Sequence, residues 1–228
     1  MTPARERLVI ALDVPTAAEA RNLVAAVGEA AVFYKVGKQL FTAEGPQVVR
    51  DLTAAGKKVF LDLKYHDIPN TVAGAIGEAA KLGVDMLTVH ASGGGKMLRA
   101  AVEAAKARPG MAVLAVTVLT SLNDDDLDKI GVRGHVLDQV MRLAAIALAD
   151  GCQGIVASAH EARQLRKEFG QEFLLVTPGV RPLGAAVGDQ ARVVTPAEAF
   201  AAGASHIVVG RPITGASDPA AAARGILG

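Results

Sequence analysis

The stretch VFLDL at residues 59–63 is a short run of apolar side chains interrupted by a single aspartate. Similar runs are LVIAL at 8–12, MLTVH at 86–90 and HIVVG at 206–210. Strands of a parallel sheet are buried on both faces and therefore have nearly continuous apolar sequences. These four runs predict strands of a parallel sheet.

Comparable runs recur along the whole chain and alternate with Ala-rich segments of helical spacing, such as 17–30, 94–107 and 135–150. The runs begin near Leu8, Val32, Val59, Met86, Ala112, Gly154, Phe173 and His206. Eight strands that alternate with helices at roughly 24–30 residues per unit indicate an α/β fold, a (β/α)8 TIM barrel. A doubly wound open sheet of about six strands is the alternative.

Local signals mark where the helices begin and end. Capping boxes predict helix starts at Thr16–Glu19, Ser158–Glu161 and Thr195–Glu198. Helices are expected to stop at Gly56, Gly83, Gly151, Gly170 and Gly203. The acidic stretch 123–128 is expected to be a solvated loop that leads into an extra helix, and 180–193 a mobile loop after the seventh strand.

Length and composition restrict the class of protein. The 228 residues predict a single domain spanning 1–228. With 24 basic against 23 acidic residues and no Trp, the chain offers neither a field nor stacking platforms for nucleic acid, and no field for a membrane surface. Cys152 is the one cysteine, so no internal disulfide can form. The apolar run at 8–12 is too short for a signal-peptide core. We therefore expect a cytoplasmic protein.

Charged residues stand at the ends of the first three predicted strands. These residues are Asp13, Lys35, Asp62, Lys64 and Asp67. Active sites of TIM barrels lie at the carboxyl ends of the strands. Asp62 and Lys64 are two residues apart, so regular alternation would point both inward at the barrel mouth. A structural salt-bridge cluster is the alternative, but a set of four charges, Lys35, Asp62, Lys64 and Asp67, is more easily explained by a ligand.

The last two predicted strands end in residues suited to phosphate. Gly210 would let the backbone approach an anion closely, and Arg211 offers a fork of donors. Arg181 and Gln190, after the seventh strand, could close over the same anion. An ordinary turn with a solvated arginine is the alternative.

Other polar residues give weaker signals. Thr120 or Ser121, after the fifth strand, could present a hydroxyl to a polar ring or could cap a helix. The histidines show no metal-ligand spacing, and no Gly-rich dinucleotide or Walker motif is present, so neither a metal nor a nucleotide cofactor is expected. His90 and Cys152 are expected to be packing residues.

Several segments spread over essentially the whole chain match the sequence pattern of one known family. The most specific is FLDLKYHDIPNTV at 60–72. The others are ALDVP at 11–15, YKVG at 34–37, VHASGG at 89–94, VTVLTS at 116–121, TPGVRP at 177–182, GDQ at 188–190 and VVGRPIT at 208–214. In these segments the chain resembles the orotidine 5′-monophosphate decarboxylase family.

This resemblance implies conversion of orotidine 5′-monophosphate to uridine 5′-monophosphate and CO₂ without cofactor or metal, the last step of de novo UMP synthesis. Lys64 corresponds to the proton donor, and Asp62 to the carboxylate beside the departing CO₂. Lys35 and Asp67 complete the charged network. The implied form is a homodimer in which Asp67 and Thr71 reach the site of the other subunit.

The resemblance also assigns the contacts to the rest of the substrate. Asp13 and Lys35 would contact the ribose, and Thr120 with Ser121 the pyrimidine. The implied phosphate-binding residues are Arg181, Gln190, Gly210 and Arg211. Two alternatives stay open: a metal-dependent sugar-phosphate decarboxylase or aldolase of a related barrel family, in which Lys35 would repel the cation, and a non-catalytic barrel that binds nucleotide phosphate.

Overall fold

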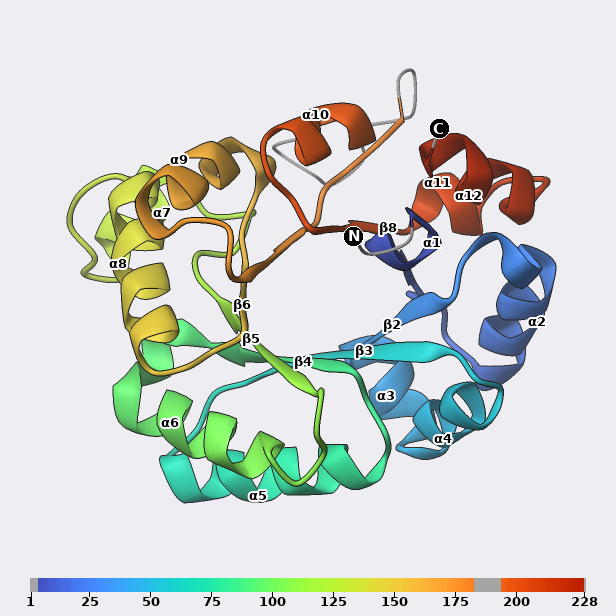
Figure 1. Ribbon diagram of the computed structural model, residues 1–228, viewed down its shortest axis with the longest axis horizontal. Helices are drawn as coiled ribbons and strands as arrows, with labels where there is room; N and C mark the ends of the chain where they lie inside the picture. Colours follow the sequence, from blue (N-terminus) through green and yellow to red (C-terminus); the bar gives the residue numbers. More distant parts are fainter. Residues whose placement is uncertain (1–3, 183–193, 228) are drawn as a thin grey trace.

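A computed structural model describes residues 4–182 and 194–227 and shows a closed parallel barrel (Figure 1). Eight strands within these ranges pair in chain order, and β8 closes against β1. The strands are β1 Leu8–Ala11, β2 Phe33–Gly37, β3 Lys58–Tyr65, β4 Met86–His90, β5 Ala112–Val116, β6 Gly154–Val156, β7 Leu174–Thr177 and β8 His206–Val209. The predicted TIM barrel is confirmed, and the open doubly wound sheet is excluded.

Helices surround the strands as an outer ring, except α1, which lies against β1, β2 and β8 inside that ring (Figure 1). They are α1 Ala4–Arg7, α2 Ala17–Val27, α3 Lys38–Glu44, α4 Gln47–Ala54, α5 Pro69–Lys81, α6 Gly94–Ala105, α7 Asp124–Lys129, α8 Val136–Ala149, α9 Ala159–Phe169, α10 Pro196–Ala201, α11 Arg211–Thr214 and α12 Pro219–Leu227, with 3₁₀ turns η1 Gly28–Ala30 and η2 Ala91–Gly93. In the part of the chain that is described, none of them has the length and hydropathy needed to cross a bilayer.

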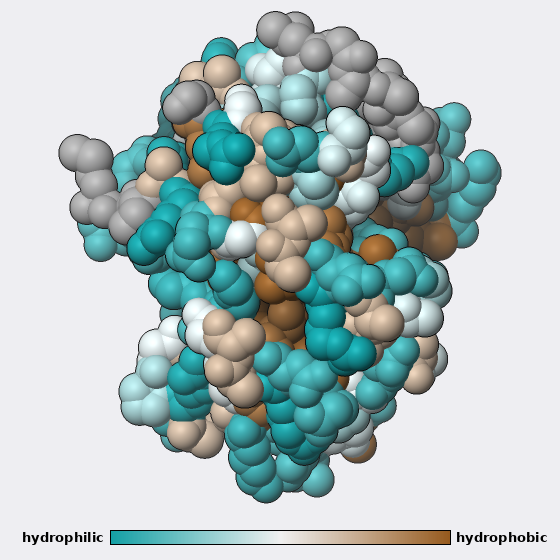
Figure 2. Space-filling view, turned by 90° about the vertical axis from the view of Figure 1, so that its right-hand side faces the viewer, coloured by the Kyte–Doolittle hydropathy of each residue, from teal (hydrophilic) through white to brown (hydrophobic). Residues whose placement is uncertain are grey.

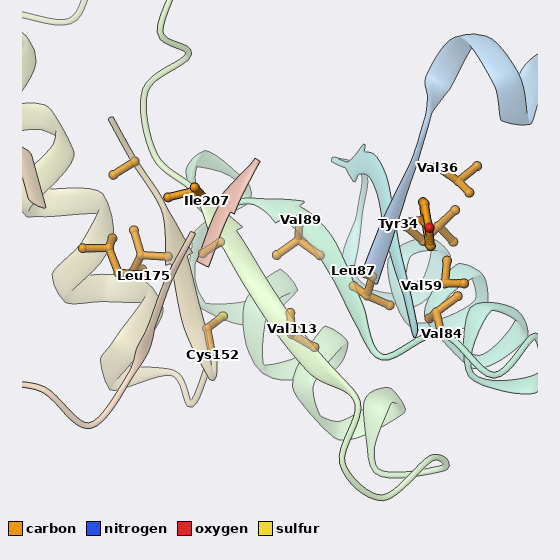
Figure 3. Packing of buried hydrophobic residues seen from close by; sticks show 14 of the residues in the cluster. Tyr34, Val36, Val59, Val84, Leu87, Val89, Val113, Cys152, Leu175 and Ile207 are labelled. Carbon is orange, nitrogen blue, oxygen red and sulfur yellow. The ribbon is translucent and has the colours of Figure 1, made fainter. Parts of the chain in front are cut away.

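Strand residues alternate between two apolar layers. Val9, Phe60 and Val176 belong to the cluster that fills the barrel. Leu87 and Leu175 point the other way, into the larger cluster between sheet and helices (Figure 3). On the face that carries α2 and α4, apolar side chains lie in a hollow between mostly hydrophilic ones (Figure 2). The helices thus expose mostly polar faces, and apolar side chains reach the surface in this hollow.

Most of the predicted helix boundaries agree with the structure. The Thr195–Glu198 capping box is present. At Thr16–Glu19 one half of the predicted box forms: Thr16 accepts a hydrogen bond from the Glu19 amide, but the Glu19 carboxylate accepts from the Thr16 hydroxyl and not from the Thr16 amide. Gly170 caps α9 with φ 79°, and the other four expected glycines follow their helices by two residues. Ser158 precedes α9 as expected, but the capping box predicted there is wrong. Its hydroxyl donates to the buried Glu161 carboxylate instead, because a buried carboxylate needs a donor.

The acidic stretch differs from the expected loop. Residues 124–128 form most of α7 themselves, and Asn123 caps that helix in a box with Asp126. Three aspartates in the first turn stabilise the positive end of the helix dipole, which explains why a charge run folds here. The loop expected at 180–193 lies outside the described residues except for its first three, of which Val180 bridges to Val194.

Candidate active site

Two adjoining cavities open at the carboxyl ends of the strands. The larger has a volume of about 430 Å³, and Asp13, Arg181, Gly210 and Arg211 are among its lining residues. The smaller, of about 150 Å³, is lined mainly by apolar side chains together with Asp62, Lys64 and Thr120. Lys35, Pro178 and Val208 border both cavities. The mouth therefore offers a polar compartment next to an apolar one that contains an ion pair.

Four charges of alternating sign run from one cavity to the other. The Lys35 ammonium lies 3.0 Å from Asp13 Oδ1 and 3.7 Å from Asp62 Oδ2. The Lys64 ammonium lies 2.7 Å from Asp62 Oδ1. The side chains of Lys35 and Asp62 are only 11% and 13% exposed, so these charges interact in a medium that screens them poorly. Hereafter these four residues, Asp13, Lys35, Asp62 and Lys64, are called the charge cluster.

The neighbouring ammonium groups keep Asp62 ionised. Burial raises the pKa of its carboxyl, but the charges of Lys64 and Lys35 and hydrogen bonds from Lys64 and Thr88 outweigh burial, and the pKa lies below its usual value. At neutral pH the smaller cavity therefore presents a carboxylate and an ammonium side by side.

The backbone at Lys64 does not follow the regular alternation that the sequence suggested. The register of β3 against β4 shifts between Leu61 and Tyr65, and Lys64 has φ 53°, the one positive φ among the described non-glycine residues. This conformation costs a non-glycine residue about 1–2 kcal/mol. Asp62 and Lys64 do meet at the mouth, but a bulged strand brings them together, and such a bulge is common next to active sites.

Thr88 on β4 is a buried residue that the sequence analysis did not single out. Its Oγ accepts a hydrogen bond from the Lys64 amide at 2.9 Å and donates one to Asp62 Oδ1 at 3.0 Å. The available signal was a hydroxyl between two apolar residues, Leu87 and Val89, within the strand MLTVH.

Gly37 at the end of β2 was quoted within the YKVG segment but not recognised as a site residue. A Cβ atom at this position would lie 2.9 Å from the Lys35 ammonium and 3.1 Å from Asp13 Oδ1. Only a glycine leaves room for this ion pair, so the residue has a steric reason to lack a side chain.

Asp67 does not join the other charges within one chain, contrary to what its place after the strand suggested. It is exposed, pairs with no described cation, and accepts a hydrogen bond from the Ile68 amide at 2.6 Å. The chain turns away from the mouth here to begin α5, on whose first turn Thr71 is also exposed. Within a single chain, the fourth charge beside Lys35, Asp62 and Lys64 is therefore Asp13 and not Asp67 as expected.

Two loops meet at the other side of the larger cavity. Gly210 and Arg211 follow β8, and Arg181 follows β7. A Cβ atom at Gly210 would lie 3.5 Å from that of Ala11, so the backbone approaches β1 closely. Arg181 is buried and donates a hydrogen bond to the Val180 carbonyl at 3.0 Å. Gln190 lies outside the described residues.

The remaining predicted site residues follow β5. Thr120 lines the smaller cavity and Ser121 is exposed beside it. Neither caps the following helix, since Asn123 does. His90 is half-buried, and its ring lies 5.5 Å from that of His66, while Cys152 is buried, which raises its pKa to about 12. No group of three potential metal ligands occurs among the described residues.

Comparisons with known proteins agree on one family. Residues 6–226 match the family described as "Orotidine 5'-phosphate decarboxylase / HUMPS family". Similar proteins named orotidine 5′-phosphate decarboxylase occur in Halorhodospira halophila (56% identity, 98% of this chain and 95% of the relative) and Moorella thermoacetica (50%, 98% and 91%). The crystal structure of orotidine 5′-phosphate decarboxylase from Lactobacillus acidophilus is similar with a TM-score of 0.88 at 40% identity, over 97% of both chains.

Proposed function

The chain belongs to the orotidine 5′-phosphate decarboxylase / HUMPS family and is a carboxy-lyase acting on orotidine 5′-phosphate, and we propose that the two cavities at its barrel mouth carry out the reaction. The observation that carries this assignment is the Lys64 ammonium, which stands 2.7 Å from Asp62 in a small, mainly apolar cavity beside a larger polar one. The products are uridine 5′-phosphate and CO₂.

The two cavities suggest how the substrate lies. The phosphate occupies the larger cavity, where Arg181, Gly210 and Arg211 bind it together with Gln190. The ribose lies between the cavities, against Asp13 and Lys35. The pyrimidine enters the smaller cavity, where Thr120 and Ser121 contact its polar edge and carbon 6 faces Lys64. In this placement the charge cluster lies alongside the substrate, from its ribose to its pyrimidine ring.

Lys64 supplies both the charge and the proton for the chemical step. When the bond between carbon 6 and the carboxyl carbon breaks, the electron pair stays in an in-plane orbital that the π system of the ring cannot absorb. A fixed ammonium aimed at carbon 6 stabilises this charge and then donates a proton to it. The amine that remains regains its proton from solvent, so one proton is consumed for each CO₂ released.

Asp62 contributes in two ways. It holds the Lys64 ammonium in place by a direct ion pair. As an ionised carboxylate it also repels the carboxylate of the substrate, and this repulsion is relieved as CO₂ leaves. Asp62 is thus both a positioning group and a source of ground-state destabilisation.

One ammonium group does not account for the whole rate enhancement. A preorganised donor contributes about 3–4 kcal/mol, whereas enzymes commonly lower barriers by about 8–23 kcal/mol. The phosphate supplies much of the rest, because the binding energy of a remote group can hold a site ordered around the reacting atoms. Arg211 and Arg181 are therefore expected to affect the chemical step as well as binding.

The active form is a homodimer of single-domain chains in the cytoplasm, serving pyrimidine synthesis. Asp67 and Thr71 are exposed next to the mouth and reach the site of the partner subunit, where Asp67 completes the charged network. Neither nucleic acid nor membrane is a partner. A measurement of molecular size tests the dimer. A mixed dimer of one Lys64→Ala chain and one Asp67→Ala chain tests the shared site, because one of its two sites keeps both residues and the other keeps neither. Activity restored in the mixture supports the proposal, and an inactive mixture contradicts it.

The assay that tests the function follows the ultraviolet absorbance of orotidine 5′-phosphate as the purified protein converts it, with and without EDTA. Undiminished turnover in EDTA supports decarboxylation without a metal. Loss of turnover in EDTA, restored by Mg²⁺, would place the chain with metal-dependent sugar-phosphate enzymes, although Lys35 puts an ammonium at the strand end where a cation would bind.

A further inference from the structure

We propose that Thr88 is a positioning residue for the reaction: its single hydroxyl fixes the Lys64 backbone and the Asp62 carboxylate relative to each other, so that the ammonium is aimed before substrate binds. This inference rests on the proposed function, because it assumes that Lys64 is the proton donor. It adds a buried residue on β4 that does not touch the substrate.

Three hydrogen bonds form a closed ring at this point. The Lys64 amide donates to Thr88 Oγ at 2.9 Å, and Thr88 Oγ donates to Asp62 Oδ1 at 3.0 Å. The same Oδ1 accepts from the Lys64 ammonium at 2.7 Å. Lys64 is therefore held at both ends, its backbone through Thr88 and its side chain through Asp62.

The bulge explains why such a hydroxyl is needed. The register shift between Leu61 and Tyr65 takes this part of β3 out of the regular ladder with β4. A buried amide that lacks its ladder partner needs another acceptor. Thr88 provides one, and it does so for the residue with positive φ, whose unusual backbone must be held by its surroundings.

A hydroxyl can serve both neighbours at once. It accepts from the amide and donates to the carboxylate at the same time, which a valine of the same shape cannot do. Thr88 is fully buried and lines neither cavity, so it can act only through Lys64 and Asp62.

The test compares Thr88→Val, which keeps the shape, with Thr88→Ser, which keeps the hydroxyl. Thr88→Val is expected to lower kcat about 10- to 100-fold with little change in KM, because misplacing a reacting group by about 1 Å costs on that order. It also removes a hydrogen bond that lowers the pKa of Asp62, so the acidic limb of the kcat profile moves to higher pH. Thr88→Ser is expected to stay within about threefold of the parent and to keep the parental pH profile.

Thr177→Val is the matched control, because it removes a buried hydroxyl that has no hydrogen-bond partner in the described structure, on a side of β7 that faces the helices. It should leave kcat and the pH profile unchanged. Equal losses in Thr88→Ser and Thr88→Val, parental kcat in Thr88→Val, or an unmoved acidic limb would each overturn the inference. If Thr88→Val does not fold, Thr88→Ala carries the same prediction. Failure of the parent chain to turn over orotidine 5′-phosphate would instead refute the proposed function.

Discussion

The two ends of the barrel both contain buried or half-buried charges, but they use them differently. At the amino-terminal end, Lys58 pairs with Glu6 at 2.7 Å, and Arg7 donates to the carbonyls of Ser205 and Ala204 while its guanidinium lies 4.0 Å from the Phe200 ring centre. None of these groups lines either of the two active-site cavities. At the carboxyl-terminal end the charge cluster lines two cavities.

This difference separates stability from function. The charges at the base tie α1 to the strands, so they hold the fold together. The charge cluster adds little to the stability of the fold by comparison, since buried ion pairs contribute little net stability and Lys64 has an unfavourable backbone conformation. Changes at the mouth should therefore alter activity more than stability, and changes at the base should do the reverse.

Replacing Lys64 should have the largest effect. Lys64→Ala is expected to reduce kcat by at least about 10³-fold, because it removes both the electrostatic stabilisation and the proton donor. Binding of uridine 5′-phosphate, measured by calorimetry, should persist, and the melting temperature should stay close to that of the parent. Substantial residual kcat would refute the role assigned to Lys64.

The steric requirement at Gly37 gives the next largest effect. Gly37→Ala is expected to lower kcat/KM about 100-fold, because the added Cβ displaces Lys35 from Asp13. Gly225→Ala on α12 is a matched control, since a Cβ there meets open space; it should keep full activity and stabilise the helix by about 0.5–1 kcal/mol. Parental kcat/KM in Gly37→Ala would show that the ion pair does not need this glycine.

Arg211→Ala tests the phosphate side of the mouth. The loss of a charged hydrogen-bond donor should lower kcat/KM by about 10- to 100-fold, or about 1.5–3 kcal/mol. The urea midpoint is expected to remain near the parental value, because the fold does not depend on phosphate binding. A mutant with the same kcat/KM as the parent would exclude Arg211 from this site.

The base of the barrel should respond to pH through His206. Burial lowers its pKa to about 4, and the charges of Arg7 and Lys58 act in the same direction. The unfolded chain, in which the pKa is near 6.5, then binds more protons between these values, so stability falls as pH decreases from 6.5 towards 4. The expected loss between pH 7 and pH 5 is about 2 kcal/mol, measured by urea denaturation. A His206→Leu chain should lack this part of the slope; an identical slope would refute it.

The surface pair at the base gives the smallest effect. Lys58→Met should lower the free energy of unfolding by less than about 1 kcal/mol, because both partners are partly exposed. Its kcat/KM should equal that of the parent. A clear loss of activity in this variant would break the separation between the two ends of the barrel.

Local patterns were sufficient to predict the barrel but not the details of its mouth. The strands were found because each is a short apolar run, and all of them begin within one residue of the predicted starts. The bulge at Lys64 could not be predicted, since it depends on how β3 meets β4. The same holds for Thr88, Gly37 and the exposed position of Asp67, which result from contacts between distant segments. The resemblance to a known family identified the candidate site residues, and the structure shows how far apart they lie and which of them are in contact.

A crystal structure with uridine 5′-phosphate bound tests the central claim most directly. We predict that the Lys64 ammonium lies about 3 Å from carbon 6 of the ring, still paired with Asp62, and that the phosphate contacts Arg211. An ammonium turned away from the ring, or a divalent cation in its place, would contradict it.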